Sequence, residues 1–124
     1  MTLYIDTSKN NLIYLALKND DKLILEKKIQ AKYSQAEKLL PGIDKLLKSA
    51  NSGITKIKKI IAVNSGEGFT ALRIGIITAN ALGFALNIPV FSSDNKQIKS
   101  DYDFSIIKPK YKKEPNITVP KNNN

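Results

Sequence analysis

The sequence contains neither cysteine nor histidine among its 124 residues. Without cysteine there is no disulfide framework and no thiol chemistry. Without either residue type, Ser-His and Cys-His nucleophilic sites are excluded, and so are metal sites built from histidine or cysteine. We therefore expect a chain with no catalytic residues, no metal and no resident cofactor.

Arginine is nearly as scarce, since 19 of the 20 basic residues are lysine and Arg73 is the single exception. With 11 acidic residues the net charge is +9, which can attract nucleic acid. A chain rich in lysine, asparagine and isoleucine is equally typical of a compositional bias, in which the charges only solvate the surface. Because the planar guanidinium suits carboxylates, Arg73 is a candidate contact to a partner carboxylate or to Glu67.

Long uninterrupted apolar runs are also missing. The longest, residues 74–90, contains two asparagines, two glycines and a proline, so it does not predict a membrane span. The first six residues read as a strand and lack the basic leader and apolar core of a signal peptide. We expect a cytoplasmic protein with one core, because the length suits one domain.

Five short segments have the β-rich or apolar composition of strands: 3–6, 11–18, 22–29, 58–63 and 88–91. The first three follow one another across short turns, which predicts a meander. A helical pattern precedes each of the last two, and strands that alternate with helices pair in parallel. The order βββαβαβ predicts a mixed sheet in an α/β sandwich.

Residues 34–50 form the clearest helical pattern, with apolar side chains at the 3.6-residue period. Ser34 and Glu37 have the spacing of a capping box. Pro41 is expected to interrupt and bend this helix, and Asn51 and Gly53 are expected to end it.

A second helix is predicted at residues 70–87, after a glycine-rich turn, with Thr70 as its N-cap. Its only charge is Arg73, and an almost wholly apolar helix must be covered on more than one side. Small residues recur at every fourth position and form one ridge: Ala71, Gly75, Ala79 and Gly83. We expect this ridge to face away from the sheet and to pack closely against a helix of another protein.

The last segment of the chain is polar and basic. Residues 103–107 predict one more edge strand, and residues 108–124 predict an extended tail that follows a domain of residues 1–107. The tail begins with a cluster that suits tRNA phosphates: Lys108, Lys110, Tyr111, Lys112 and Lys113. The alternative is a solvated tail with no partner.

Three motifs together resemble the TsaB family of bacterial tRNA threonylcarbamoyladenosine biosynthesis proteins, also called YeaZ and related to Gcp-like domains. They are residues 3–8, residues 33–41 and the turn with its helix, residues 65–75. The family's turn is similar to Gly-Pro-Gly-Ser-Phe-Thr-Gly-Leu-Arg-Ile-Gly, which this chain matches at Gly66, Gly68, Phe69, Thr70, Leu72, Arg73, Ile74 and Gly75. The family's helix usually begins His-Ser-Glu, whereas this chain has Tyr33-Ser34-Gln35. The resemblance covers residues 1 to about 93.

The resemblance implies an actin-like ATPase fold with two ribonuclease-H-like lobes, of which this chain has room for the first. Because residues 107–115 are similar to the segment that closes the family's sequence, we expect a minimal member of the family. Such proteins are not catalysts. They dock on the catalytic paralogue TsaD, and some dimerise, through the two helices of the first lobe. The complex, aided by the ATPase TsaE, modifies an adenosine in the anticodon loop of tRNA. The interface expected here comprises Ser34, Glu37, Ala71, Arg73, Ile74, Gly75 and Thr78.

Two turns are candidate phosphate sites. Asp6-Thr7-Ser8 stands where actin-like ATPases hold phosphate and magnesium, but such folds hold nucleotide between two lobes, and the alternative is a turn with an Asx hydrogen bond. Gly66-Glu67-Gly68 precedes a helix, yet it lacks the Lys-Ser/Thr of a P-loop and Glu67 would repel phosphate. The alternative is a tight strand-to-helix turn, and we expect nucleotide binding at neither.

Two other classes of function stay open. One is a stand-alone RNA-binding module that uses the basic tail. The other is a residual phosphotransferase or nucleotide hydrolase, although Asp6 and Glu67 are the only acidic residues near the candidate turns and neither has a visible general-base partner.

Overall fold

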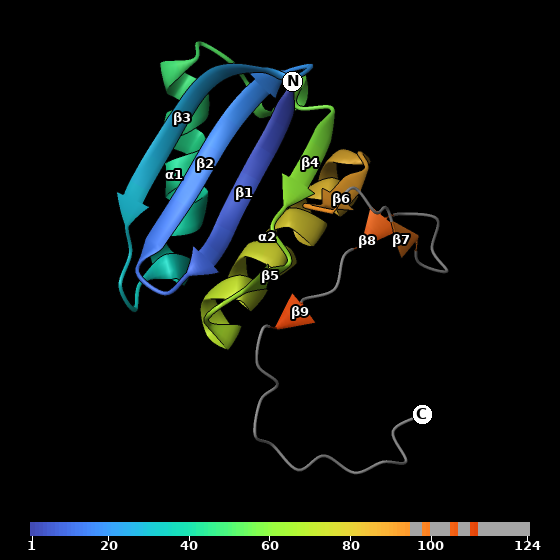
Figure 1. Cartoon of the computed structure of the whole chain (residues 1–124). Coiled ribbons are helices and arrows are strands. Elements are labelled where there is room, and N and C mark those ends of the chain that lie inside the picture. Colours follow the sequence, from blue (N-terminus) through green and yellow to red (C-terminus); the bar gives the residue numbers. More distant parts are fainter. Residues whose placement is uncertain (95–97, 100–104, 107–109, 112–124) are drawn as a thin grey trace.

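The computed structural model describes residues 1–94, 98–99, 105–106 and 110–111. Its main body is a five-stranded sheet with two helices on one face (Figure 1). In chain order the elements of this body are β1 (Thr2–Lys9), β2 (Leu12–Asn19), β3 (Lys22–Gln30), α1 (Gln35–Ser49), β4 (Lys59–Ala62), α2 (Phe69–Leu86) and β6 (Val90–Ser92). The predicted order of three strands, helix, strand, helix and strand is confirmed.

The sheet has the strand order β3-β2-β1-β4-β6. β1, β2 and β3 form the predicted antiparallel meander, with tight turns at Asn10-Asn11 and Asp20-Asp21. β4 pairs in parallel with β1, and β6 pairs in parallel with β4. A helix lies in the connection that leads to each of these parallel strands, because a parallel partner requires a crossover.

Both helices cover the same face of the sheet, and the core lies between them and the strands (Figure 1). Ile5 of β1 lies opposite Leu15 of β2, and both side chains are fully buried on this face. Gly42 of α1 lies against Leu15, and Gly75 of α2 lies against Thr7, two residues after Ile5. Alternate residues of a strand point to the same side, so α1 and α2 share one core.

α1 differs from its prediction in two respects. Ser34 is the N-cap residue, but it makes no side-chain hydrogen bond to the helix end, so the predicted capping box with Glu37 is wrong. Pro41 lies inside the helix without interrupting it, and α1 is a single helix of 15 residues. Pro41 is exposed, so the hydrogen bond that its missing N–H would have made is lost at the solvent side.

α2 begins at Phe69 with Gly68 as its N-cap, so the predicted cap at Thr70 is wrong by two residues. The backbone N–H of Leu72 donates to the carbonyl of Gly68 over 3.1 Å, which is the first bond of the helix. The helix ends at Leu86, and its C-cap residue Asn87 has a φ of 55°, the left-handed conformation typical of a helix end.

Three two-residue strands and β5 (Ser65–Gly66) lie outside the main sheet. β7 (Ile98–Lys99) pairs with β8 (Ser105–Ile106), so the strand predicted at 103–107 is shorter and does not join the five-stranded sheet. β9 (Lys110–Tyr111) pairs in parallel with β5, which brings the start of the basic segment beside the glycine-rich turn. Lys108, Lys112 and Lys113 lie outside the described residues, and the boundary predicted at residue 107 stays a prediction.

Candidate functional site

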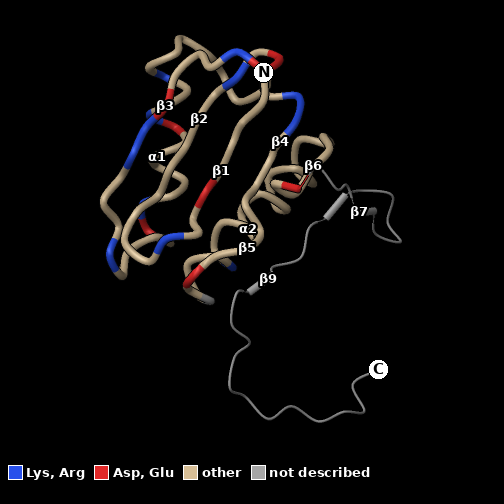
Figure 2. Tube along the Cα trace, in the orientation of Figure 1, with Lys and Arg blue, Asp and Glu red and all other residues tan. Residues whose placement is uncertain are grey.

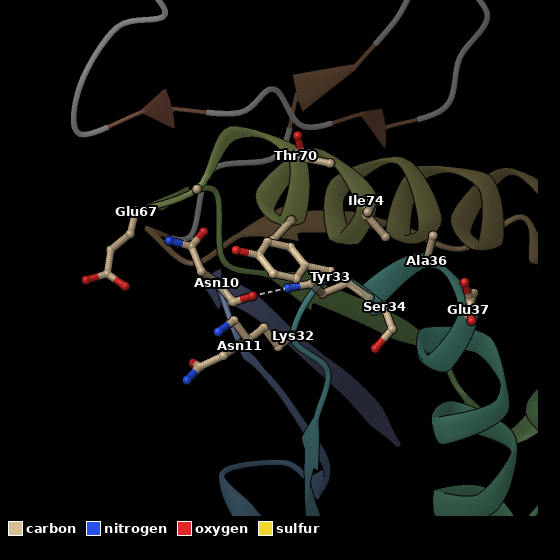
Figure 3. Close-up of a pocket in the computed structure, with 13 residues that line it drawn as sticks. Asn10, Asn11, Lys32, Tyr33, Ser34, Ala36, Glu37, Glu67, Thr70 and Ile74 are labelled. Atoms are coloured by element: carbon tan, nitrogen blue, oxygen red, sulfur yellow. Dashed lines mark hydrogen bonds between the residues drawn. The ribbon is translucent and has the colours of Figure 1, made fainter.

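A cleft of about 890 Å³ lies between the N-termini of α1 and α2 (Figure 3). The parallel strands β1 and β4 end near these helix N-termini (Figure 1). Crevices at the carboxyl ends of strands are common ligand positions in α/β folds. The cleft is lined from three segments that the sequence keeps apart: Asn10, Asn11, Lys32, Tyr33, Ser34, Gln35, Ala36, Glu37, Glu67, Gly68, Thr70, Ala71 and Ile74.

Hydrogen bonds to the β1–β2 turn fix the position of the segment before α1. The backbone N–H of Ala31 donates to the carbonyl of Asn11 over 3.0 Å, and the side-chain amide of buried Gln35 donates to the carbonyl of Asn10. Tyr33 takes a left-handed φ of 59° and is 90% exposed, so its ring projects into the cleft, as Figure 3 shows. The ammonium of Lys32 lies 5.5 Å from the centroid of this ring.

The glycine-rich turn forms the other wall, and its glycines serve close packing. A Cβ at Gly66 would lie 2.6 Å from the Cβ and 2.7 Å from the backbone of Ser8, and a Cβ at Gly68 would overlap the side-chain oxygen of Asn10. The N–H of Glu67 donates to the carbonyl of Ser8 over 3.0 Å. These contacts favour the strand-to-helix turn over a phosphate loop, since they use the space and one of the amides that an anion would need.

The Asp6-Thr7-Ser8 turn contains the Asx hydrogen bond that was the alternative to a phosphate site. A carboxylate oxygen of Asp6 accepts from the N–H of Ser8 over 2.8 Å. Thr7 is 1% exposed, and its hydroxyl, for which the described residues offer no hydrogen-bond partner, packs against Gly75. None of these three residues lines the cleft. The expectation that no nucleotide binds there stays a prediction.

The small-residue ridge of α2 faces the sheet, so the prediction that it faces away is wrong. Ala71 and Ala79 are buried, and a Cβ at Gly75 or at Gly83 would collide with Thr7 or with Val90 of the sheet. The ridge is small because the helix lies close against β1 and β6. Two residues of the predicted interface, Ala71 and Gly75, therefore belong to the core of this chain.

The remaining predicted interface residues lie at the surface or at its edge. Arg73 is exposed, Ile74 and Thr78 are half-buried on the outer side of α2, and Ser34 and Glu37 border the cleft. The alternative partner of Arg73 within the chain was Glu67, and no ion pair joins these two described residues. Arg73 is not among the residues that line the cleft.

Sequence reasoning missed the part of the cleft that comes from the β1–β2 turn and from Lys32. Asn11 was expected only as the first residue of a strand, and Asn10 was given no role. The sequence carries no signal that the carbonyl of Asn10 accepts a hydrogen bond from Gln35. The lining side chains are mainly amides, hydroxyls, one amine and two carboxylates. Such a set can recognise a polar segment through hydrogen bonds. Among the described residues, no three acidic side chains gather as metal ligands, and no helix is long and apolar enough to cross a membrane.

Comparisons with known proteins agree on one family. Residues 28–93 match the family model TsaD, described as tRNA N6-adenosine threonylcarbamoyltransferase. The chain is 30% identical over 88 residues to the tRNA threonylcarbamoyladenosine biosynthesis protein TsaB of Bacillus subtilis, covering 71% of this chain and 38% of that protein. The structure of YeaZ from Pseudomonas aeruginosa superposes with a TM-score of 0.67 at 28% identity, over 73% of this chain and 42% of that one. A second structure, of an uncharacterized protein with similarity to peptidase YEAZ from Pseudomonas aeruginosa, superposes with a TM-score of 0.68 at 28% identity. That match covers 73% of this chain and 41% of the other. The chain thus spans about two fifths of the length of these relatives.

Proposed function

Because this chain belongs to the TsaD family, and within it is a TsaB- and YeaZ-like protein, we propose that it takes part in threonylcarbamoyladenosine modification of tRNA. The matched residues, 28–93, include both helices, the glycine-rich turn and most of the cleft. The parts of the chain that carry the family resemblance are therefore the same parts that form the candidate site.

We propose that its role is that of a non-catalytic subunit, which docks on a TsaD-like catalytic subunit. The observation that carries this proposal is the outer side of α2, which is apolar although it faces solvent. Ile77 is 61% exposed and Phe84 is 64% exposed, and Ala81 lies between them. A helix that simply faces water carries polar residues on that side, and here Arg73 is the only charge on the helix.

The docking surface proposed here extends from α2 onto α1. We define it as Ile74, Ile77, Ala81 and Phe84 of α2 together with Leu40 of α1, which is 55% exposed. Ala36 of α1 lines the same cleft as Ile74, and Leu40 lies one helical turn beyond Ala36 on the same side. Large exposed apolar side chains that gather in this way are typical of protein–protein interfaces.

The test is the variant Ile77→Asp, measured by co-purification and by titration with the TsaD-like subunit. A charge in the middle of the docking surface would lose apolar burial and would have to be desolvated. We expect affinity to fall about 30-fold, which corresponds to ~2 kcal/mol at a central interface residue. The melting temperature should hardly change, because Ile77 contributes little to the core.

The matched control is Ile24→Asp, which makes the same change at another exposed isoleucine, 44% exposed on the edge strand β3. We expect this variant to bind the partner like the wild type. If Ile77→Asp binds normally, the docking surface lies elsewhere. Reconstituted tRNA modification with and without the chain tests the role itself: the complex should need the chain, and the chain alone should show neither transfer nor ATP turnover.

The remaining partners follow from the same role and are proposed with it. A TsaE-like ATPase and tRNA would associate through the complex, and a second copy could occupy the docking surface when the catalytic subunit is absent. Such a role would also place the protein in the cytoplasm. Light scattering of the chain alone and with the TsaD-like subunit distinguishes a homodimer from a heterodimer on this surface.

A further inference from the structure

The face of the sheet opposite the helices carries a second surface, which the proposed docking does not use. Strand register aligns a row across four strands on this face: Ala16, Tyr4, Ile61 and Phe91. α1 and α2 cover the other face, and no element of the described residues covers this one (Figure 1). Tyr4, Ile61 and Phe91 are each partly exposed. We call this surface the open sheet face.

Three aromatic rings lie on the open sheet face. Tyr4 and Tyr14 meet edge to face with ring centroids 6.1 Å apart and planes at 74°. Phe91 stands two strands from Tyr4, and two strand spacings are about 10 Å. Rings presented at separate positions on a sheet are the arrangement on which single-stranded nucleic acids stack their bases.

Two lysines lie over rings of this face, and a third lies next to one, so a base that stacks on a covered ring would displace a flexible amine toward the phosphate. The ammonium of Lys18 lies 5.0 Å from the centroid of Tyr4, and that of Lys59 lies 5.6 Å from the centroid of Phe91. Lys28 is the strand neighbour of Tyr14. Figure 2 shows basic positions along β3 and at the start of β4. Each of the three rings thus has a lysine near it. A nucleotide whose base stacks on one of these rings would place its phosphate within reach of that lysine.

The two carboxylates on this face are already engaged by the protein. Glu26 accepts a hydrogen bond of 2.6 Å from the hydroxyl of Tyr14, and Asp6 accepts from the N–H of Ser8. Neither forms an ion pair with a lysine of the described residues, so Lys18, Lys28 and Lys59 stay available for phosphate. A protein partner with an apolar surface would have to bury these amines without counter-charges, which is costly. The charge pattern thus favours a polyanion over an apolar protein surface as the occupant.

We propose that the open sheet face binds single-stranded RNA, with bases stacked on Tyr4, Tyr14 and Phe91 and phosphates held by Lys18, Lys28 and Lys59. The choice of RNA as the polyanion rests on the proposed role in tRNA modification. The binding itself does not depend on the docking surface, which lies on the opposite side of the molecule. Recognition would be largely indifferent to sequence, because stacking and phosphate contacts carry little base information.

The experiment measures fluorescence anisotropy of a short labelled oligouridylate with the full chain over a range of salt concentrations. Phe91→Leu keeps an apolar side chain and removes the stacking ring, and we expect it to weaken binding by about 5- to 150-fold. Lys59→Gln should weaken binding and reduce the slope of log affinity against log salt by ~0.7, the value for one lost phosphate contact to a single strand.

Three control variants separate this surface from others. Lys45→Gln removes an exposed charge on α1, on the opposite side of the sheet, and should bind like the wild type apart from a small loss of general attraction. Lys112→Gln/Lys113→Gln tests the basic tail, and Ile77→Asp tests the docking surface. Both should keep the stacking contribution, and melting curves establish that every variant is folded.

The proposal is overturned if the wild type does not bind the oligouridylate, or if folded Phe91→Leu and Lys59→Gln bind like the wild type. It is also overturned if the tail variant alone abolishes binding, because the tail would then be the site. A normal result for Ile77→Asp on RNA together with lost binding to the catalytic subunit supports two separate surfaces. Failure of the docking proposal therefore leaves this one standing, and the reverse also holds.

Discussion

Gly75 provides the sharpest test of how α2 packs. It lies in the middle of the helix, and a Cβ at this position would fall 3.1 Å from the Cγ2 and 3.2 Å from the Cβ of Thr7, and nearer still to its hydroxyl oxygen. Thr7 is buried in the central strand β1 and is β-branched, so rotation about χ1 brings one branch into the place of the other. Gly75→Ala therefore forces the helix and the strand apart.

Two opposing effects determine the size of the change. Overpacking a closed core costs about 1–3 kcal/mol, and the upper end applies because neither the strand nor the side chain can yield. Alanine in place of glycine inside a helix returns about 1 kcal/mol. The net expectation is a loss of about 2 kcal/mol in the free energy of unfolding. At about 4 °C per kcal/mol for a domain of this size, the melting temperature should fall by roughly 8 °C.

The assay is urea unfolding followed by circular dichroism for the two single variants and their double mutant. Thr7→Ala removes both branches that collide, so Gly75→Ala/Thr7→Ala should recover most of the loss, with a coupling of about 1–3 kcal/mol. Ala81→Gly, at an exposed position of α2, measures the helix-propensity effect alone and should cost about 1 kcal/mol. If Gly75→Ala stabilises the protein and Thr7→Ala does not change its effect, α2 is not packed against β1 as described.

The other predictions concern α1 and the open sheet face. Gly42→Ala should be neutral or stabilising by up to about 1 kcal/mol in urea unfolding, because its Cβ would meet mainly the flexible end of Ile29; a loss as large as that of Gly75→Ala would contradict this. The hydrogen bond to Glu26, helped by burial and nearby negative charge, raises the pKa of Tyr14 from 10.0 to about 12. The neutral ring is therefore favoured in the folded state, so its contribution to stability is complete below pH 10.0 and is lost as pH rises toward about 12. Tyr14→Phe should remove the step at the highest pH in the tyrosinate absorbance titration. If that step remains in the variant, another tyrosine titrates at this pH.

The order and type of the main elements could be predicted because each depends on local pattern. β1 to β3 have strand-forming residues between turn signals, and α1 repeats its apolar side chains at the period of a helix. The ends were less predictable. Thr70 and the Ser34–Glu37 pair have the sequence of caps, yet the caps seen are Gly68 and a Ser34 without a side-chain bond. A cap depends on where the neighbouring chain lies, and local sequence does not contain that.

The site could be predicted only in part. Ser34, Glu37 and Ile74 were expected at one surface, and they do border one cleft. Asn10 and Lys32 were not expected there, since they come from segments far from α2 in sequence. Their side chains reach the cleft because β1 lies in the middle of the sheet and its turn opens toward both helix N-termini.

The sequence by itself determined that α2 is a helix, that it is apolar nearly all round, and that a ridge of small residues requires something to approach it closely. Only the tertiary structure decided what approaches. A single apolar stripe, as on α1, predicts which side of the helix packs on the sheet. α2 has apolar residues on every side, so its sequence is compatible with more than one orientation of the helix on the sheet. The packing of Gly75 on Thr7 and of Gly83 on Val90 selects the ridge as the inner side. That choice leaves Ile77 and Phe84 outside, where a partner can reach them.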